Sequence, residues 1–212
     1  MVSWDGKYHN HSRSWAWGPE FLTRAGARAL AKGEILIGAP RLLASFLSPG
    51  QESYPLGSDL EAATEYIRSN YQIKRVVVLV SGDPGFYSLA AFIRNRFPEE
   101  VLEFIPGISS IQLMFARLKQ PWQDVAFISR HGRQDQRLLG VLQAGLVAAV
   151  LTDKVNTPQG LAAELLAGGC SDLPVSVGCN LSLETEYLYR GSLSQLKDYN
   201  KILLNCVVVI GV

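Results

Sequence analysis

Cysteine is scarce in this chain of 212 residues: there are three, Cys170, Cys179 and Cys206. They are odd in number, widely spaced and without the Cys-x-x-Cys spacing of a zinc site, which argues against a disulfide framework. Buried free thiols in a reducing cytoplasm are the expected state. His9 and His11 have no thiolate nearby and are more typical of a solvated tail than of a metal site, so no metal is expected.

A large charge imbalance and long apolar runs are also missing. The formal net charge is +1, which argues against a general nucleic-acid binder. No apolar run approaches the roughly 18 residues that span a bilayer, and residues 1–6 contain no apolar signal core. With 48% hydrophobic and 18% charged residues, the chain is expected to fold around a sizeable core as a cytoplasmic protein without nucleic-acid or membrane partners.

Apolar runs alternate with amphipathic segments, which predicts an α/β protein of two lobes with largely parallel sheets. The break at 119–121 predicts a boundary: an atypical segment at 1–17, a first lobe at 18–120 and a second at 121–212. Strands are expected at 34–38, 76–80, 102–105, 125–129, 146–151, 175–178, 187–191 and 206–210. Helices are expected at 21–32, 40–46, 60–70, 88–97, 111–117, 136–143, 158–166 and 193–197.

The most informative stretch is Ser-Gly-Asp-Pro-Gly-Phe at 81–86, between an apolar run and a helical segment. Open α/β sheets bind ligands beyond the carboxyl ends of their strands, and glycine lets the backbone approach a ligand closely. The stretch is therefore a candidate ligand-facing corner. An ordinary strand-to-helix turn explains it equally well.

Three further motifs follow in order: Ile-Pro-Gly-Ile-Ser-Ser at 105–110, Ile-Ser-Arg-His-Gly-Arg at 128–133 and Val-Leu-Thr-Asp-Lys at 150–154. Together with Gly-Ala-Pro-Arg-Leu-Leu at 38–43, this set resembles the tetrapyrrole (corrin/porphyrin) methylase family over residues 18–212. The resemblance implies two α/β lobes with a cofactor cleft between them. It also implies methyl transfer from S-adenosylmethionine to carbon 5 of a corrin-ring precursor in cobalamin biosynthesis.

The resemblance further implies which residues face the cofactor, from both lobes. Asp83 has a second interpretation as a turn residue that binds its own backbone. The implied cofactor contacts are Gly82, Asp83, Pro84, Ser109, Ser110, Leu151, Thr152, Gly178, Cys179 and Asn180.

Corrin precursors carry many carboxylates, which arginine binds in charge-assisted hydrogen bonds. Arg130, Arg133 and Arg41 are therefore the expected substrate contacts, with a solvated basic loop as the alternative. His131 is a candidate general base because its ordinary pKa lies near neutrality, and a structural histidine beside Gly132 is an equal alternative.

The front of the chain departs from the family pattern. An apolar strand and a Gly-x-Gly-Pro-Gly loop are expected before the first helix, and only Trp17-Gly18-Pro19 stands there. Three explanations stay open: residues 1–17 form a substitute for the missing strand and loop, the chain starts at the wrong position, or the lobe is incomplete. Three functions stay open: the corrin methyltransferase, a methylase of another acceptor, and a non-catalytic interaction protein. A homodimer and a partner that methylates carbon 15 and decarboxylates the ring are also implied by the resemblance.

Overall fold

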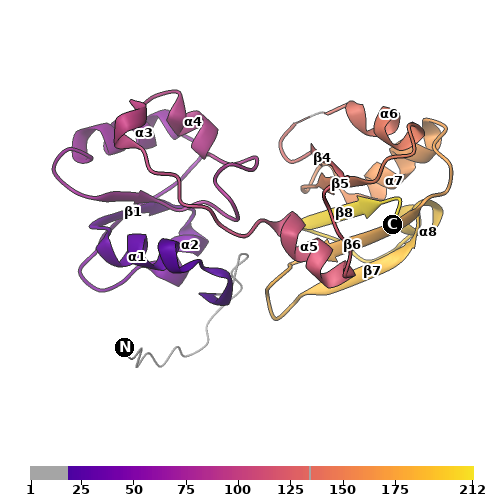
Figure 1. The fold of residues 1–212 in the computed structure, drawn as a ribbon, viewed down its shortest axis with the longest axis horizontal. Coiled ribbons are helices and arrows are strands. Elements are labelled where there is room, and N and C mark those ends of the chain that lie inside the picture. Colours follow the sequence, from indigo (N-terminus) through magenta and orange to yellow (C-terminus); the bar gives the residue numbers. More distant parts are fainter. Residues whose placement is uncertain (1–18, 134) are drawn as a thin grey trace.

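The computed structural model describes residues 19–133 and 135–212. They form two lobes, each with its own sheet, and the chain passes between them just before helix α5 (Ser110–Leu118) (Figure 1). The expected two-lobe α/β architecture is confirmed. The atypical segment at 1–17, with His9 and His11, lies outside the described residues. Within the described residues, no helix is both long and apolar enough to cross a membrane.

The first lobe is built on a three-stranded parallel sheet in the order β2-β1-β3. β1 is at its centre and is fully buried, with Ile35 paired to both neighbours. Helices α1 and α2 lie on one side of the sheet and α3 and α4 on the other (Figure 1). The strands are β1 (Ile35–Gly38), β2 (Glu52–Pro55) and β3 (Val76–Val78), and the helices are α1 (Arg24–Lys32), α2 (Pro40–Phe46), α3 (Leu60–Asn70) and α4 (Ala90–Arg94).

Two elements of this lobe differ from the sequence prediction. Strand β2 was not expected, because its Glu-Ser-Tyr-Pro sequence is polar and ends in a proline, which sheets tolerate only at an edge. The strand predicted at 102–105 is wrong. After a short 3-10 helix, η2 (Glu99–Val101), Leu102 is extended, but residues 102–105 pair with no described strand.

The second lobe has five strands in the order β4-β5-β8-β6-β7. Only β4 and β5 are parallel, so the prediction of a largely parallel sheet is wrong here. The physical reason is the short link between β6 and β7, which holds no helix and can join only antiparallel strands. The strands are β4 (Ala126–Ser129), β5 (Ala148–Leu151), β6 (Pro174–Cys179), β7 (Tyr187–Ser192) and β8 (Cys206–Ile210).

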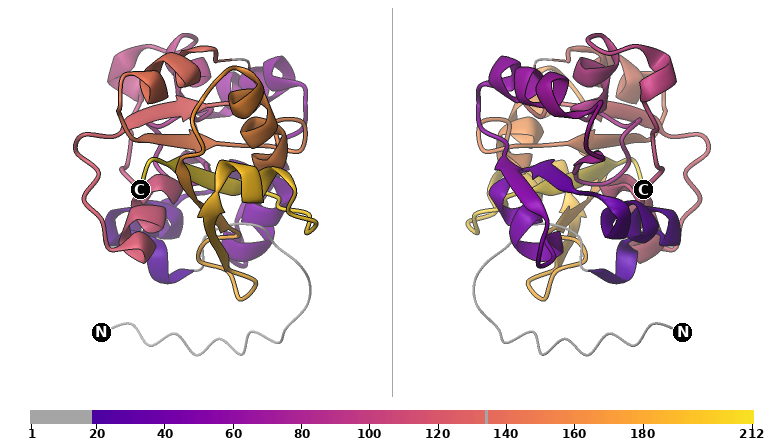
Figure 2. Two further views of the ribbon diagram at one scale, coloured as in Figure 1. Left: turned by 90° about the vertical axis from the view of Figure 1, so that its right-hand side faces the viewer. Right: turned by 90° about the vertical axis from the view of Figure 1, so that its left-hand side faces the viewer.

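Alternate residues of this sheet face different helices, as the twofold period of a strand requires. Ala148 and Val150 pack with α6 (Arg137–Gln143), α7 (Pro158–Ala167) and α8 (Leu193–Lys197). Ala149 packs with α5 on the face toward the first lobe. Figure 2 shows α7 and α8 on the outer side of the second lobe.

Helix α5 precedes the predicted boundary at 120 but packs against the second sheet. This packing favours a division of the lobes before α5, near residues 106–109, which we offer as a proposal. The three cysteines are buried and free, as expected.

Candidate functional site

Two loops of the first lobe are clamped together by one carboxylate. Asp83 Oδ1 accepts a hydrogen bond from the backbone of Gly85 (2.8 Å), and Oδ2 accepts one from the backbone of Gly107 (3.0 Å). A Cβ atom on Gly107 would overlap the carbonyl oxygen of Gly82, and Gly82 itself has a φ of +76°, which favours glycine. The 81–86 corner is therefore locked against the 106–110 loop.

This junction leaves backbone donors without partners. Among the described residues, the N–H groups of Gly82, Asp83, Ile108 and Ser110 form no hydrogen bond. Ile108 and Ser110 lie at the amino end of α5, where unpaired N–H groups attract anions. Backbone donors of this kind suit the carboxylate and hydroxyl groups of an amino-acid-like ligand.

Ser109 takes part in the cap of helix α5 through its hydroxyl oxygen and its backbone. It accepts a hydrogen bond from the backbone of Gln112 (3.2 Å), while the Gln112 side chain accepts from the backbone of Ser109 (2.7 Å). This reciprocal arrangement is a capping box that starts α5. The backbone N–H and carbonyl of Ser109 are both used at the start of α5, so a ligand contact at Ser109 is limited to the O–H donor of its hydroxyl.

The predicted cofactor residues of the second lobe lie at the carboxyl ends of strands β5 and β6. The backbone N–H and the hydroxyl of Thr152 both donate to the carbonyl oxygen of Cys206 (3.2 and 3.0 Å). Cys179 is paired in register with Cys206, and their sulfur atoms are 2.7 Å apart. Burial and the Cys179 thiol together raise the pKa of Cys206, the contact with Cys179 being the larger cause. Asn180 follows Cys179 with a left-handed φ of +48°.

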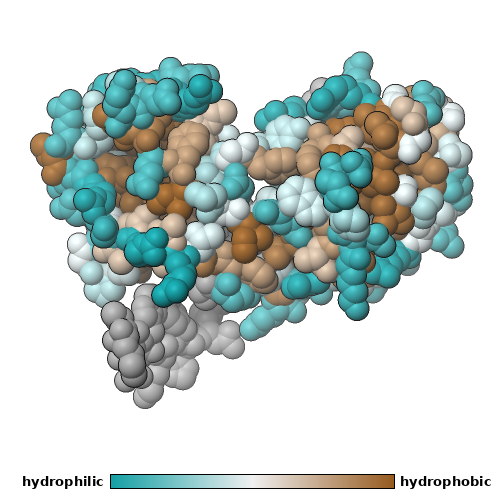
Figure 3. Space-filling view, viewed as in Figure 1, coloured by the Kyte–Doolittle hydropathy of each residue, from teal (hydrophilic) through white to brown (hydrophobic). Residues whose placement is uncertain are grey.

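Residues next to the first-lobe loop and at the end of β5 pack against one apolar cluster around α5. Ile108 from the first lobe and Leu151 from the second pack against the same apolar cluster, which includes Leu181. Gly178 is packed so closely that a Cβ there would lie 2.5 Å from the Met114 sulfur of α5. The surface is indented between the two lobes (Figure 3).

Tyr87 connects the first-lobe corner to the second lobe. Its hydroxyl donates to the carbonyl oxygen of Phe127 (3.2 Å), and the guanidinium of Arg133 lies 5.2 Å from its ring centre. Phe86 makes an edge contact with the Phe127 ring at 5.8 Å. Sequence reasoning missed Tyr87, whose left-handed φ of +49° is rare for a bulky residue and marks a constrained turn.

The basic tract divides into one buried and several exposed side chains. Arg130 is 3% exposed and pairs with Glu164 at 2.7 Å, and its carbonyl accepts from the Asn156 side chain (2.7 Å). Because the guanidinium is already bound inside the fold, the expected substrate contact at Arg130 is not supported, and the residue is better assigned to structure. His131 and Arg133 are exposed.

The His131 contact selects one tautomer. Its Nδ1 lies 3.3 Å from the carbonyl oxygen of Thr152. A carbonyl can only accept, so this contact places the ring proton on Nδ1 and leaves Nε2 as an acceptor. The imidazole is thus held next to the end of β5, and its Nε2 has no hydrogen-bond partner in the described part of the chain.

A carboxylate holds the loop beneath this histidine. Asp153 accepts hydrogen bonds from the backbone of Gly132 (2.6 Å), Val155 (2.8 Å) and Asn156 (2.7 Å). Burial alone raises the pKa of Asp153, but these hydrogen bonds outweigh it and lower the pKa to about 2. The Asp-x-x-Asn spacing at 153–156 is the sequence signal for this turn.

Arg41 lies at the opposite, first-lobe end of the site. It donates to the Ser81 hydroxyl (2.7 Å), directly before the glycine corner, and burial lowers its pKa. The contact places Arg41 beside the 81–86 corner.

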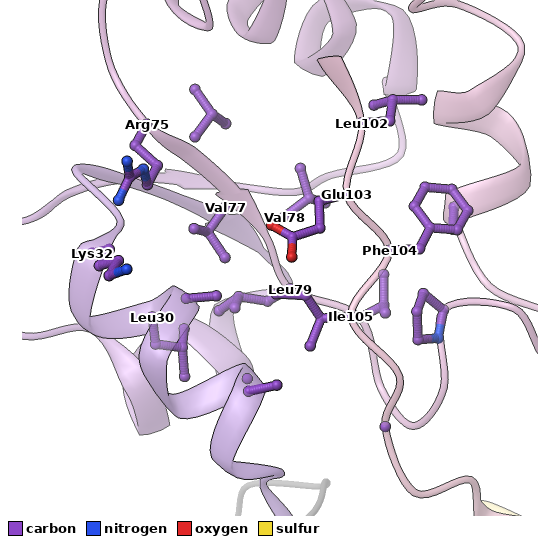
Figure 4. Close-up of a pocket in the computed structure, with 18 of the residues that line it drawn as sticks. Leu30, Lys32, Arg75, Val77, Val78, Leu79, Leu102, Glu103, Phe104 and Ile105 are labelled. Atoms are coloured by element: carbon purple, nitrogen blue, oxygen red, sulfur yellow. The ribbon is translucent and has the colours of Figure 1, made fainter. Parts of the chain in front are cut away.

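A large cavity lies inside the first lobe, and its lining includes residues of the two clamped loops. Its volume is about 1330 Å³, and Gly82, Pro84 and Gly107 are among the residues that line it. Figure 4 shows Val77 and Leu79 on one side of the cavity and Phe104 and Ile105 on the other. Within the described residues, no three His, Cys, Asp or Glu side chains are grouped so that they could hold a metal ion.

Comparison with known proteins shows similarity to one family and to several of its named members. The family described as Tetrapyrrole (Corrin/Porphyrin) Methylases matches residues 18–197. The chain is 32% identical over 194 residues to cobalt-precorrin-7 C(5)-methyltransferase of Salmonella typhimurium, covering 91% of this chain and 94% of that protein. It is 34% identical over 94 residues to precorrin-6Y C(5,15)-methyltransferase [decarboxylating] of Sinorhizobium, covering 44% of this chain and 23% of that protein.

A solved structure shares the fold. Uroporphyrin-III C-methyl transferase from Thermus thermophilus, complexed with S-adenosylhomocysteine, superposes with a TM-score of 0.73 at 20% identity. The superposition covers 91% of this chain and 92% of that one.

Proposed function

The chain belongs to the tetrapyrrole (corrin/porphyrin) methylase family, and we propose that it methylates carbon 5 of a corrin-ring precursor, with S-adenosylmethionine as donor, in cobalamin biosynthesis. The observation that carries this proposal is the similarity to cobalt-precorrin-7 C(5)-methyltransferase over nearly the whole of both chains. The donor supplies a methyl group on a sulfonium, whose leaving group is already activated.

The residues present suit that cofactor. The backbone donors of Gly82, Asp83, Ile108 and Ser110, which have no partner among the described residues, provide hydrogen bonds for the carboxylate and ribose of such a molecule. We assign the cofactor to the predicted positions of both lobes. Those positions are Gly82, Asp83, Pro84, Ser109, Ser110, Leu151, Thr152, Gly178, Cys179 and Asn180.

Alignment is the main task of the protein in this reaction. Holding a donor and an acceptor in a productive geometry contributes about 7–11 kcal/mol to lowering a barrier. The Asp83 clamp keeps the glycine corner in one conformation, and α5 fixes that corner relative to the second-lobe edge. No nucleophilic side chain is needed.

His131 and the exposed arginines complete the proposed site. His131 accepts the proton from the methylated carbon through Nε2, because Nδ1 is turned toward Thr152. Arg133 and Arg41 bind carboxylates of the substrate, and Arg130 holds the loop that carries His131 and Arg133.

Calorimetric titration with S-adenosylhomocysteine tests the cofactor assignment, and we expect one saturable site per chain. A methylation assay then compares cobalt-precorrin-7 with uroporphyrinogen III, and only the first is expected to gain a methyl group. Absence of binding by a folded sample would count against any methyltransferase and favour a non-catalytic role. If the protein binds S-adenosylhomocysteine but methylates only uroporphyrinogen III, the family assignment stands and the proposed substrate is wrong.

Assembly is the last part of the proposal. The Sinorhizobium relative is named for both C(5,15) methylation and decarboxylation, and the match covers 23% of it. A separate polypeptide that methylates carbon 15 and decarboxylates the ring is therefore the proposed partner, and the chain itself is proposed to be a cytoplasmic homodimer. Light scattering behind gel filtration measures the dimer, and a monomer at micromolar concentration would contradict it.

A further inference from the structure

Residues 180–186 form the loop between β6 and β7, which begins with Asn180, one of the proposed cofactor contacts. Two non-glycine residues of this loop have left-handed backbone angles, Asn180 with a φ of +48° and Ser182 with a φ of +72°. Such angles are unfavourable for residues that carry a Cβ atom and persist only where surrounding contacts hold them. The loop therefore needs a restraint to keep the conformation that presents Asn180.

The carboxylate of Glu186 supplies this restraint from the far end of the loop. Its Oε2 accepts a hydrogen bond from the backbone N–H of Ser182 (2.7 Å). Its two oxygens also accept hydrogen bonds from Nε and Nη2 of Arg117 (2.6 and 3.2 Å). The Arg117 contact lowers the pKa of Glu186 and outweighs burial, which raises it, so the carboxylate is charged at neutral pH. One side chain thus holds the strained turn and ties it to helix α5.

Arg117 is in the last turn of α5, the helix whose amino end adjoins the loop at 106–110. A planar guanidinium that donates two hydrogen bonds to one carboxylate fixes the direction as well as the distance between two elements. Leu181 of the same loop is buried in the apolar cluster that contains Met114 of α5. Helix α5 therefore adjoins the first-lobe loop at its amino end and holds the 180–186 loop from its carboxyl half.

The side chain of Asn180 is also bonded locally. Its Nδ2 donates to the hydroxyl of Thr185 (3.2 Å), within the loop. Its Oδ1 accepts from Nδ2 of Asn205 (3.5 Å), directly before β8. These contacts orient the Asn180 side chain within the loop, whereas the Arg117–Glu186 pair sets the position of the whole loop on α5.

We propose that Arg117 and Glu186 are positioning residues for the cofactor, an inference that rests on the proposed function. The pair holds the Asn180 turn on α5, so that the second-lobe wall of the cofactor site keeps its place relative to the backbone donors of the 106–110 loop. Both side chains act through the loop and not by contact with the cofactor. The pair is thus the second-lobe counterpart of the Asp83 clamp.

Hydrogen exchange without ligand tests whether the pair holds the loop. Arg117→Met keeps a long side chain and removes both hydrogen bonds, and Arg117→Lys keeps the charge but loses the planar two-bond contact. We expect the amides of 180–186 to exchange several-fold faster in Arg117→Met, with a smaller change in Arg117→Lys and none in β6. Circular dichroism confirms that both variants are folded. Unchanged exchange at 180–186 in Arg117→Met overturns the proposal.

Calorimetric titration with S-adenosylhomocysteine tests the effect on the cofactor site. We expect the dissociation constant to rise about fivefold in Arg117→Met, the upper end for a partly exposed ion pair, and less in Arg117→Lys. KM for the corrin substrate is expected to stay unchanged, which separates cofactor positioning from a general loss of structure.

Lys74→Met is the matched control. Lys74 forms an ion pair of similar length with Glu52 (2.6 Å), at the amino ends of the first-lobe strands and so opposite the cofactor loops. This variant is expected to leave affinity for S-adenosylhomocysteine unchanged. An equal loss of affinity in Lys74→Met and Arg117→Met would overturn the positioning role.

The two measurements separate this inference from the proposed function. If the unmodified chain binds S-adenosylhomocysteine and Arg117→Met binds it equally well, the proposed function stands and the positioning role is wrong. If the unmodified chain binds none, the proposed function and the cofactor role both fail, and hydrogen exchange still decides whether the pair holds the loop.

Discussion

Replacing Gly107 by alanine tests whether the two loops must touch. The new Cβ overlaps the carbonyl oxygen of Gly82, which is backbone and cannot rotate away. Overpacking of this kind costs about 1–3 kcal/mol, and for a chain of this size 1 kcal/mol corresponds to about 2–4 °C in Tm. We therefore expect Tm to fall by about 2–12 °C. Because the displaced loops carry the unpaired donors, affinity for S-adenosylhomocysteine falls about tenfold, or about 1.4 kcal/mol.

Gly140→Ala is the matched control. Gly140 is inside α6, where an added Cβ meets open space, so alanine is expected to stabilise the protein by about 0.5–1 kcal/mol. Thermal unfolding and calorimetric titration are run on both variants. Unchanged stability of Gly107→Ala would refute the steric argument. Lower stability with unchanged affinity would remove the 106–110 loop from the cofactor site.

Three further predictions concern the side chains around the site. Asp83→Asn retains one acceptor and places an amide N–H against a backbone N–H, so affinity for S-adenosylhomocysteine falls about tenfold, measured by calorimetry; unchanged affinity would contradict the clamp. Arg130→Met lowers the free energy of unfolding by about 1–3 kcal/mol, because packing and a partly solvated ion pair are lost. Arg133→Met instead raises KM for the corrin substrate and leaves stability unchanged. If Arg130→Met raised KM and Arg133→Met lowered stability, Arg130 would again be the expected substrate contact. Asp135 and Asp153 have pKa values of about 2 in the folded protein against an ordinary 3.8, so the unfolded chain binds protons more readily. Their stabilisation is present above about pH 4 and lost as pH falls toward 2, and acid unfolding of Asp153→Asn should show a shallower pH dependence.

The sequence predicted the bounds of those helices whose first residues carry a recognisable start signal, such as a proline or a capping side chain. The helix at 40–46 starts with a proline, and Asp59 caps the helix at 60–70, so both ranges match the structure. A strand needs a partner as well as a sequence. The sequence at 102–105 is typical of a strand, yet these residues pair with no described strand.

For the site, sequence patterns identified the right loops but not which polar atoms the fold already uses. Ser109 and Arg130 carry groups that suit a ligand, and both are bonded internally, one in a helix cap and the other in an ion pair. No spacing in the sequence distinguishes a bound guanidinium from a free one. The role of Gly107 depends on a contact with Gly82, twenty-five positions earlier, which only the folded chain brings together.

Asp83 shows that a turn role and a functional role need not compete. Both carboxylate oxygens are taken by backbone N–H groups, so Asp83 does its work by holding Gly82 and Gly107 in place, while cofactor contacts from this corner come from the backbone. In a displacement at an already activated sulfonium, placement contributes most of the rate. Substitutions at the clamp should therefore lower kcat/KM more than removal of any single substrate-binding arginine, since the arginines share the many carboxylates of the substrate and the clamp has no substitute among the described residues.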